Sequence, residues 1–261
     1  MAPLRRGPKT NDPDAELLEQ IRAALAGSPF HSESHLKIWA RLRVQGVCTS
    51  TPRVLRLMRE NQLLAPQRQV APVGDELHGS SIVSGEPNPM WDAGATTTVT
   101  LADGHVAVFA AVDPCTGACV GIHAVSRATR FEALEPLHQD VREQFGSFGH
   151  QVDAALRIRH DHGSQYSSDH FQNELHFPGM ESSPAFVCEP EGNGYTERFF
   201  RTLKEKLPWV WRFRDLEELQ LALREFRGRH NRERLVERLS FQSPRQAPER
   251  LQALRQTARL R

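Results

Sequence analysis

The feature that most restricts the possible folds is an apolar run, His105 to Val112, which lies between two turn signals. Ala102-Asp103-Gly104 precedes the run and Asp113-Pro114 follows it, and such clusters are typical of tight turns. Thr96 to Leu101 on one side and Ala118 to Val125 on the other have the composition of strands. The three segments together predict a β-meander with the apolar run as its central strand.

Helical and strand patterns alternate after this meander. A helical pattern over Phe131 to Phe145 precedes a short strand at Ala155 to Ile158, and a second helix is indicated near Phe171. Ala185 to Val187 have the composition of a brief strand, and a long helix is expected after Gly194. The order β-β-β-α-β-α-β-α predicts an α/β fold, a mixed sheet with helices around it.

A helical segment precedes the β-rich part of the chain. Residues 1–64 predict three helices, which begin at Asp12-Pro13, near Ser32 and at Thr51-Pro52. The third helix carries an outward stripe at a spacing of three, formed by Arg53, Arg56 and Arg59. Two short helices joined across a glycine-containing turn, the second with arginines, predict a DNA-binding helix-turn-helix. A protein-binding module with a solvated arginine face is the alternative.

Proline and glycine divide the chain into segments. They recur through residues 65–86, where no periodic apolar pattern survives, so this stretch is predicted to be a linker. We therefore expect a helix-turn-helix segment at 1–64, a linker at 65–86, an α/β core at 87–250 and a basic C-terminal tail at 251–261.

The net charge hides a segregation of charge along the chain. The chain has 33 basic and 32 acidic residues, a formal net charge of +1, which by itself gives no indication of a nucleic-acid partner. Residues 1–70 and 197–261 carry +5 and +8, however, whereas 71–150 and 151–196 carry −7 and −5. Basic ends suit a polyanion and an acidic middle suits cations, although chance segregation is the alternative. No apolar run is long enough for a membrane span, and no signal peptide is recognisable, so a cytoplasmic protein without a membrane partner is expected.

Two carboxylates lie where α/β proteins place chemistry. Asp161 lies just past a predicted strand, in a glycine-containing loop, and Glu197 lies in the first turn of a predicted helix. Carboxylates from separate elements can converge on Mg²⁺ or Mn²⁺, although a turn-former and a helix-start charge are the simpler explanations. A transition-metal site at His160-Asp161-His162 is a competing interpretation. The spacing of Cys115, Cys119 and His123 is a poor match to known zinc sites, so a structural role for the two thiols is the preferred interpretation.

The context of the two carboxylates is more specific than their positions. The stretches His160 to Tyr166 and Glu191 to Lys204 resemble the integrase core of bacterial insertion-sequence transposases. The resemblance includes the 35 residues between Asp161 and Glu197, and Phe-Phe-x-Thr-Leu-Lys shortly after the glutamate. Arg53 to Asn61 is similar to the family's N-terminal segment, so the resemblance covers nearly the whole chain.

The resemblance implies a ribonuclease-H-like fold for the core and metal-dependent cleavage and strand transfer on DNA. It implies two ions, Mg²⁺ or Mn²⁺, held by two aspartates and a glutamate, with Asp161 and Glu197 as metal ligands. Lys204 lies two helical turns after Glu197 and matches a basic position that can hold the DNA backbone, with Arg201 as a further candidate. Implied partners are DNA (transposon ends and target), further copies of the chain and an upstream-frame protein, in nucleoid-associated bacterial cytoplasm.

The chain departs from the family at the first aspartate. That residue normally follows a tryptophan by three positions, and three residues after Trp91 this chain has Gly94. Asp92 is a conceivable substitute, because residues i and i+2 of a strand share a face, but they are roughly 6.5–7 Å apart. We therefore expect the fold to be kept and catalysis to be impaired. The alternative is a non-catalytic DNA-binding remnant or regulator of transposition.

Overall fold

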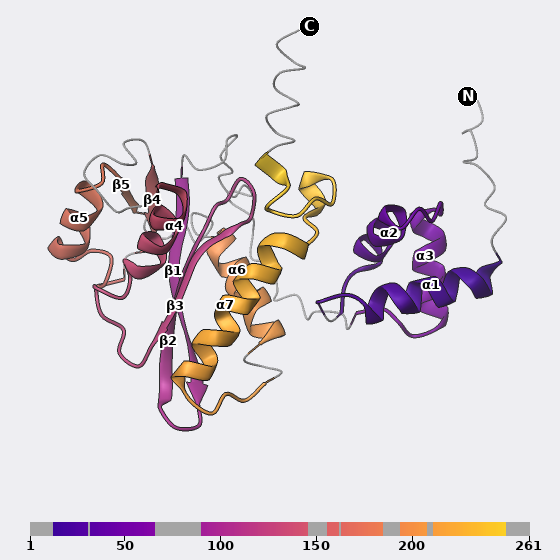
Figure 1. Cartoon of the computed structure of the whole chain (residues 1–261), viewed down its shortest axis with the longest axis horizontal. Coiled ribbons are helices and arrows are strands. Elements are labelled where there is room, and N and C mark those ends of the chain that lie inside the picture. The colour runs from indigo at the N-terminus through magenta and orange to yellow at the C-terminus, as the bar shows by residue number, and fades with distance from the viewer. Residues whose placement is uncertain are drawn as a thin grey trace, which may run out of the picture. The chain divides into compact units, whose positions relative to one another are not determined.

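A computed structural model describes residues 13–30, 32–65, 90–145, 156–161, 163–184, 194–207 and 211–248. The chain divides into two compact units, Met1–Val73 and Gly74–Arg261 (Figure 1). Each unit is described separately below.

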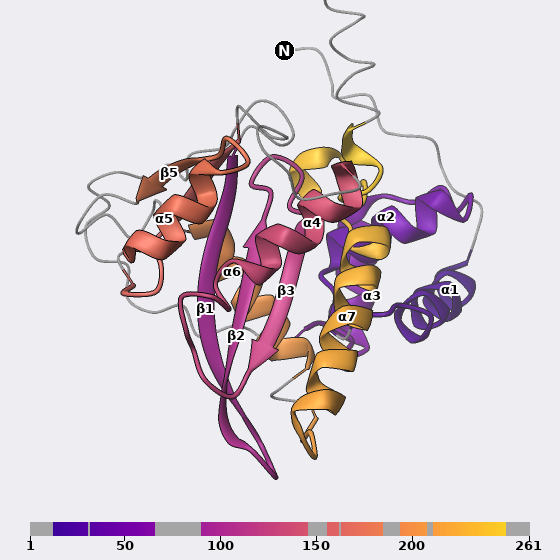
Figure 2. The same cartoon turned by 60° about the vertical axis from the view of Figure 1, so that its left-hand side comes forward.

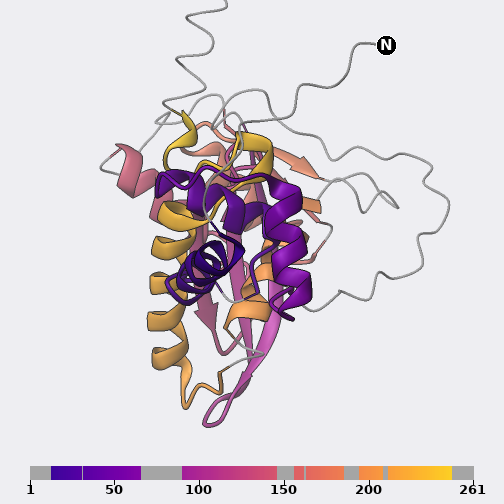
Figure 3. The ribbon, with the colours of Figure 1, turned by 90° about the vertical axis from the view of Figure 1, so that its right-hand side faces the viewer.

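The N-terminal unit consists of three helices, which can be followed in Figure 3: α1 (Asp14–Ala26), α2 (His35–Val44) and α3 (Thr51–Glu60). Each helix turns an apolar stripe inward, and together the stripes form one core that includes Leu17, Ile21, Ile38, Leu42, Val54, Leu57 and Met58. The chain enters α3 through Pro52 in its first turn, where a proline has no hydrogen bond to lose. Three helices are confirmed, whereas the helix-turn-helix assignment stays a prediction.

The second unit contains a five-stranded sheet in the order β3-β2-β1-β4-β5. Its strands are β1 (Met90–Thr100), β2 (Gly104–Val112), β3 (Cys119–Val125), β4 (Arg157–His160) and β5 (Glu181–Pro184). β1, β2 and β3 form the predicted meander with antiparallel pairing, and β4 and β5 add to it in parallel. The mixed sheet with helices around it is the ribonuclease-H-like architecture that the resemblance implies.

One predicted strand boundary needs correction, and one predicted strand cannot be compared with the structure. β1 begins at Met90 rather than Thr96, because its first residues pair with both β2 and β4 and are buried. The fifth strand lies at Glu181–Pro184, whereas the predicted strand at Ala185 to Val187 falls outside the described residues.

Helices cover both faces of the sheet (Figure 2). On one face, α4 (Glu135–Phe145) and α5 (Asp169–His176) enclose a core with Trp91 and Ala93 of β1. On the other face, α6 (Gly194–Lys206) packs against β1 and β2, and α7 (Leu216–Glu233) packs against β3. Phe199 and Phe226 join the last two helices, with ring centroids 6.1 Å apart. Because successive residues of β1 face opposite ways, Asp92 and Gly94 point toward α6.

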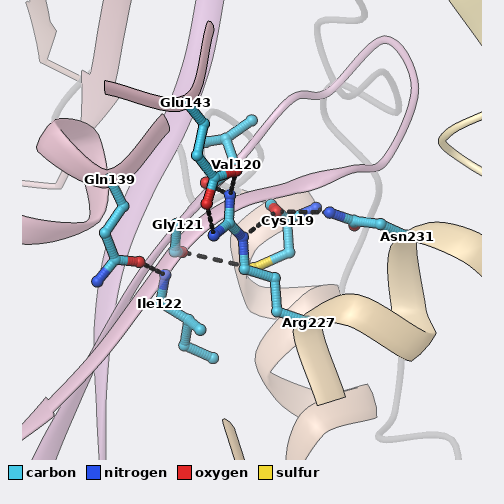
Figure 4. A network of polar contacts seen from close by, with 8 residues as sticks. All are labelled: Cys119, Val120, Gly121, Ile122, Gln139, Glu143, Arg227 and Asn231. Atoms are coloured by element: carbon cyan, nitrogen blue, oxygen red, sulfur yellow. Dashed lines mark hydrogen bonds and ion pairs between the residues drawn. The ribbon is translucent and has the colours of Figure 1, made fainter. Parts of the chain in front are cut away.

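The outer edge of β3 is closed by side chains rather than by another strand (Figure 4). Arg227 donates from Nε to the Cys119 carbonyl at 3.1 Å and forms a bidentate pair with Glu143 at 2.8 Å. Asn231 and Gln139 bind further β3 backbone groups, those of Cys119 and Ile122. An open edge invites pairing with another chain, and these contacts remove that possibility over much of β3. The Arg227 guanidinium is therefore used within the fold.

Replacement of Arg227 by methionine is expected to lower the free energy of unfolding by about 2–4 kcal/mol, because buried carbonyls lose their donor. Urea denaturation measures this loss. Arg224→Met, at an exposed position of the same helix, is the matched control and should change stability by less than about 0.5 kcal/mol. Equal stabilities of the two variants would contradict the assigned role of Arg227.

Candidate active site

Gly94 lies at the centre of the candidate site, where α6 approaches β1 closely. A Cβ atom at this position would lie 2.7 Å from Cγ2 of Thr196 and 3.3 Å from Cε2 of Phe200. The Thr196 side chain is buried, and its hydroxyl donates to the Asp92 carbonyl oxygen at 3.0 Å. Rotating the methyl group away would break that hydrogen bond. The helix therefore packs on this strand in a way that a larger residue at position 94 disturbs.

Asp161 directly follows β4, the strand that pairs with the start of β1. β1 and β4 pair in parallel as far as Asp92 opposite Arg159, and the same register continued by two residues would bring Gly94 level with Asp161. The side chain is exposed, and its Oδ1 accepts the Gly163 backbone N–H at 2.9 Å. This bond orients the carboxylate and leaves Oδ2 without a protein partner among the described residues.

Glu197 approaches the same position from the helix. It lies in the first turn of α6, is exposed to solvent and directly follows Thr196, the residue that covers Gly94. The two predicted acids thus belong to the surroundings of β1: Asp161 follows the adjacent strand β4, and Glu197 lies on the helix that packs against β1. A carboxylate in a helix's first turn also interacts favourably with the helix dipole.

Asp92 lies on the same face of β1, two residues before Gly94, but it is only 1% exposed. Neither carboxylate oxygen has a hydrogen-bond partner in the described structure. Burial raises the pKa of Asp92 to about 7, while the nearby charge of Arg159 lowers that pKa and Asp113 raises it further. A protonated, enclosed carboxyl is a poor ligand for a cation that must also reach DNA.

The residues present do not fit the two-ion centre that the resemblance implies. That centre needs three carboxylates, and the position of the first one has a glycine, Gly94, whose neighbouring space is filled by Thr196. Within the described ranges, no group of three or more histidine, cysteine, aspartate or glutamate side chains is placed to hold a metal ion.

The competing metal sites find no support in the described residues. His160 is buried, and its ring nitrogens lie 2.7 Å from the Asp161 carbonyl oxygen and 2.8 Å from Oγ of Ser182. A histidine whose two nitrogens both serve the fold is not available as a ligand, and its predicted companion His162 lies outside the described residues. His123 pairs with Glu132 at 2.7 Å.

The remaining cysteine and aspartate candidates are structural. Cys115 and Cys119 are buried in the fold, as the structural interpretation expects. Asp113 shapes the turn after β2, where its carboxylate accepts the backbone N–H of Cys115 and the hydroxyl of Thr116.

The arginines predicted to bind DNA differ in their availability. Arg53 and Arg56 both pair with Asp14 of α1, at 2.7 and 2.6 Å, and these hydrogen bonds hold the pKa of Asp14 below its usual value. Arg59 is exposed at the end of the same stripe. On α6, Arg201 is exposed and Lys204 is half-buried. Two members of the predicted stripe thus fasten α3 to α1, which the spacing of the arginines alone does not reveal.

Sequence reasoning missed Thr196 as a determinant of the site. No local pattern marks this residue, because its partners Asp92 and Gly94 lie about a hundred positions earlier in the chain. The one sequence signal for Thr196 was its position directly before Glu197. A helix that carries a site residue is expected to pack against the strand that carries Gly94.

The curated relatives with matching sequences are transposases. The chain is 24% identical over 206 residues to "Transposase InsD for insertion element IS2A/D/F/H/I/K" of Escherichia coli, a match covering 77% of this chain and 66% of that protein. "Transposase InsD for insertion element IS2-9" of Escherichia coli strain K12 matches at the same identity, with 65% of it covered. The chain is a homologue of insertion-sequence transposases. It spans somewhat less than two thirds of the length of these relatives.

Solved integrase structures are also similar to this chain. A simian T-cell lymphotropic virus intasome chain matches with 17% identity and a TM-score of 0.49, over 80% of this chain and 69% of that chain. The HTLV-2 integrase catalytic core domain in complex with magnesium matches with 17% identity and a TM-score of 0.44, over 62% and 97%. No family model matches the chain. Among the described residues of this chain, every helix is too short or too polar to cross a membrane.

Proposed function

We propose that this homologue is a DNA-binding, transposase-type protein whose integrase-like core binds DNA but performs phosphodiester cleavage and strand transfer poorly or not at all. The observation that carries the proposal is the packing of Thr196 over Gly94, at the position where the family has its first metal-binding aspartate. Two acids of the family's set of three remain, Asp161 and Glu197, and two carboxylates hold divalent ions more weakly than three.

DNA as the partner is supported by the homology and by the distribution of charge. The two basic segments, 1–70 and 197–261, contain the predicted helix-turn-helix and the part of α6 that follows Glu197. Arg59, Arg201 and Lys204 are the side chains that we propose for phosphate contacts, because none of the ion pairs found in the described residues uses them. Binding should then weaken steeply with salt.

Further properties of the family enter the proposal through the resemblance alone. They are self-association on paired DNA ends, cooperation with an upstream-frame protein, and a place in the bacterial cytoplasm beside the nucleoid. The domain limits at 64, 86 and 250 also remain proposals. They can be tested by limited proteolysis, which should cut first between residues 65 and 86.

A strand-transfer assay with Mg²⁺ or Mn²⁺, on DNA carrying the ends of the element, tests the proposed loss of chemistry. The wild-type chain should bind this DNA and yield no more product than Glu197→Gln, which removes one of the two remaining acids. Product clearly above that of Glu197→Gln would contradict the proposed loss. If Asp92→Asn then abolished the product, Asp92 would be the substitute ligand.

A further inference from the structure

A pocket of about 510 Å³ lies at the far end of α6 from Glu197. It is formed by the second half of β1, the last turns of α6 and the segment that leads to α7. The lining includes Thr98, Lys204, Trp211, Arg212 and Phe213. The backbone N–H of Leu101 donates to the Phe213 carbonyl oxygen at 3.0 Å, which fixes the pocket wall against the β1–β2 hairpin.

The chemistry of the lining is unusual for a solvent-facing surface. Trp211 is 60% exposed, although a large aromatic residue of a folded protein is ordinarily buried. Lys204 and Arg212 contribute two positive charges beside it, and no acidic residue is found among the described lining residues. An exposed aromatic ring beside basic side chains is the combination that binds unpaired nucleotides: bases stack on the ring and phosphates contact the cations.

The position of the pocket agrees with such an occupant. Lys204 lies seven residues after Glu197, which corresponds to roughly 10 Å along the helix axis. This distance equals about three base steps of a DNA strand. A strand whose phosphodiester lies at the first turn of α6 can therefore reach the pocket within a few nucleotides if it follows the exposed face that carries Arg201.

We infer that this pocket binds one unpaired base near a DNA end, with the base stacked on Trp211 and the flanking phosphates on Lys204 and Arg212. The inference rests on the proposed DNA-binding function and adds a preference for single-stranded or frayed ends.

Fluorescence anisotropy with the full chain tests the inference, using a labelled duplex with a short single-stranded overhang and the matching blunt duplex. The wild-type chain should bind the overhang duplex about tenfold more tightly, within the range for one stacked base. Trp211→Ala should remove this advantage and leave blunt-duplex binding unchanged, whereas Trp211→Phe should keep most of it. Arg201→Gln, outside the pocket, should weaken the binding of both duplexes alike.

Each other result overturns the inference. An equal affinity of the wild-type chain for the two duplexes would show that the pocket takes no base, while the DNA-binding function would stand. No binding to either duplex would contradict the DNA-binding function itself, and the pocket assignment with it. If Trp211→Ala instead converted a dimer to a monomer in sedimentation, the pocket would be an interface between copies of the chain. Because Trp211 is largely exposed, its variants should fold, and thermal unfolding verifies this.

Discussion

Gly94→Asp alone is expected to leave strand transfer near the wild-type level, whereas Gly94→Asp combined with Thr196→Ala should raise it by roughly 100-fold or more. A metal centre contributes several kcal/mol to such a reaction, and each tenfold in rate corresponds to about 1.4 kcal/mol. The single variant restores the carboxylate but forces its Cβ to within 2.7 Å of the Thr196 methyl group. The double variant removes that methyl group and opens space for a side chain at position 94.

The packing part of this prediction can be measured without any catalysis. Gly94→Ala adds only the Cβ atom and should lower the free energy of unfolding by about 1–3 kcal/mol, because the added atom overpacks the contact with α6. In a Thr196→Ala background, the same change should be neutral or stabilising, since alanine suits a strand better than glycine. The expected coupling between the two sites is about 1–3 kcal/mol.

The stability measurement and the strand-transfer assay together distinguish an error in the packing of α6 on β1 from an error in the assumed composition of the site. Additive effects of Gly94→Ala and Thr196→Ala on stability would contradict the close packing of α6 on β1. Strong coupling in stability without recovery of strand transfer in the double variant would mean that the packing is correct and that the site lacks more than one carboxylate. Gly94→Asp activity equal to that of the double variant would show that α6 moves aside at little cost.

The sequence predicted the parts of the fold that depend on local signals. The run His105 to Val112 carries its own apolar pattern and turn residues, so β2 was predicted within one residue. α6 begins at Gly194, as expected from the glycines before it and the apolar spacing after it. The position of Asp161 after a strand follows from the same reasoning, since β4 ends at His160. The metal-binding roles of Asp161 and Glu197 stay predictions.

Features that depend on contacts between distant segments could not be predicted in this way. The start of β1 at Met90 was missed because Asp92 and Gly94 do not have strand-like side chains, and their burial comes from α6 and the flanking strands. Arg227 has the local sequence of a solvated arginine, and only the folded chain brings Glu143 and the edge of β3 to it. The same holds for Thr196 and Gly94, whose contact decides whether an acid fits the site.

Asp92→Asn is expected to make the homologue more stable at pH 8 and to flatten the dependence of its stability on pH. Burial raises the pKa of Asp92 from 3.8 to about 7, so the folded protein binds a proton that the unfolded chain releases. Below pH 3.8 the carboxyl is protonated in both the folded and the unfolded chain, so its ionisation does not reduce stability. The free energy of unfolding falls as the pH rises from 3.8 to about 7, and it falls no further above pH 7. The total corresponds to about 4 kcal/mol.

Asp113 is the matched control for this experiment, because burial raises its pKa as well but its carboxylate is hydrogen-bonded by Cys115 and Thr116. Asp113→Asn should destabilise the fold at every pH, since the amide cannot accept all of these bonds. Urea denaturation between pH 4 and 8 compares the two variants with the wild-type chain. An unchanged pH profile in Asp92→Asn would mean that the Asp92 carboxylate is solvated or bound to a cation in solution. Asp92 would then again be a candidate for the metal-binding acid that replaces the aspartate absent at position 94.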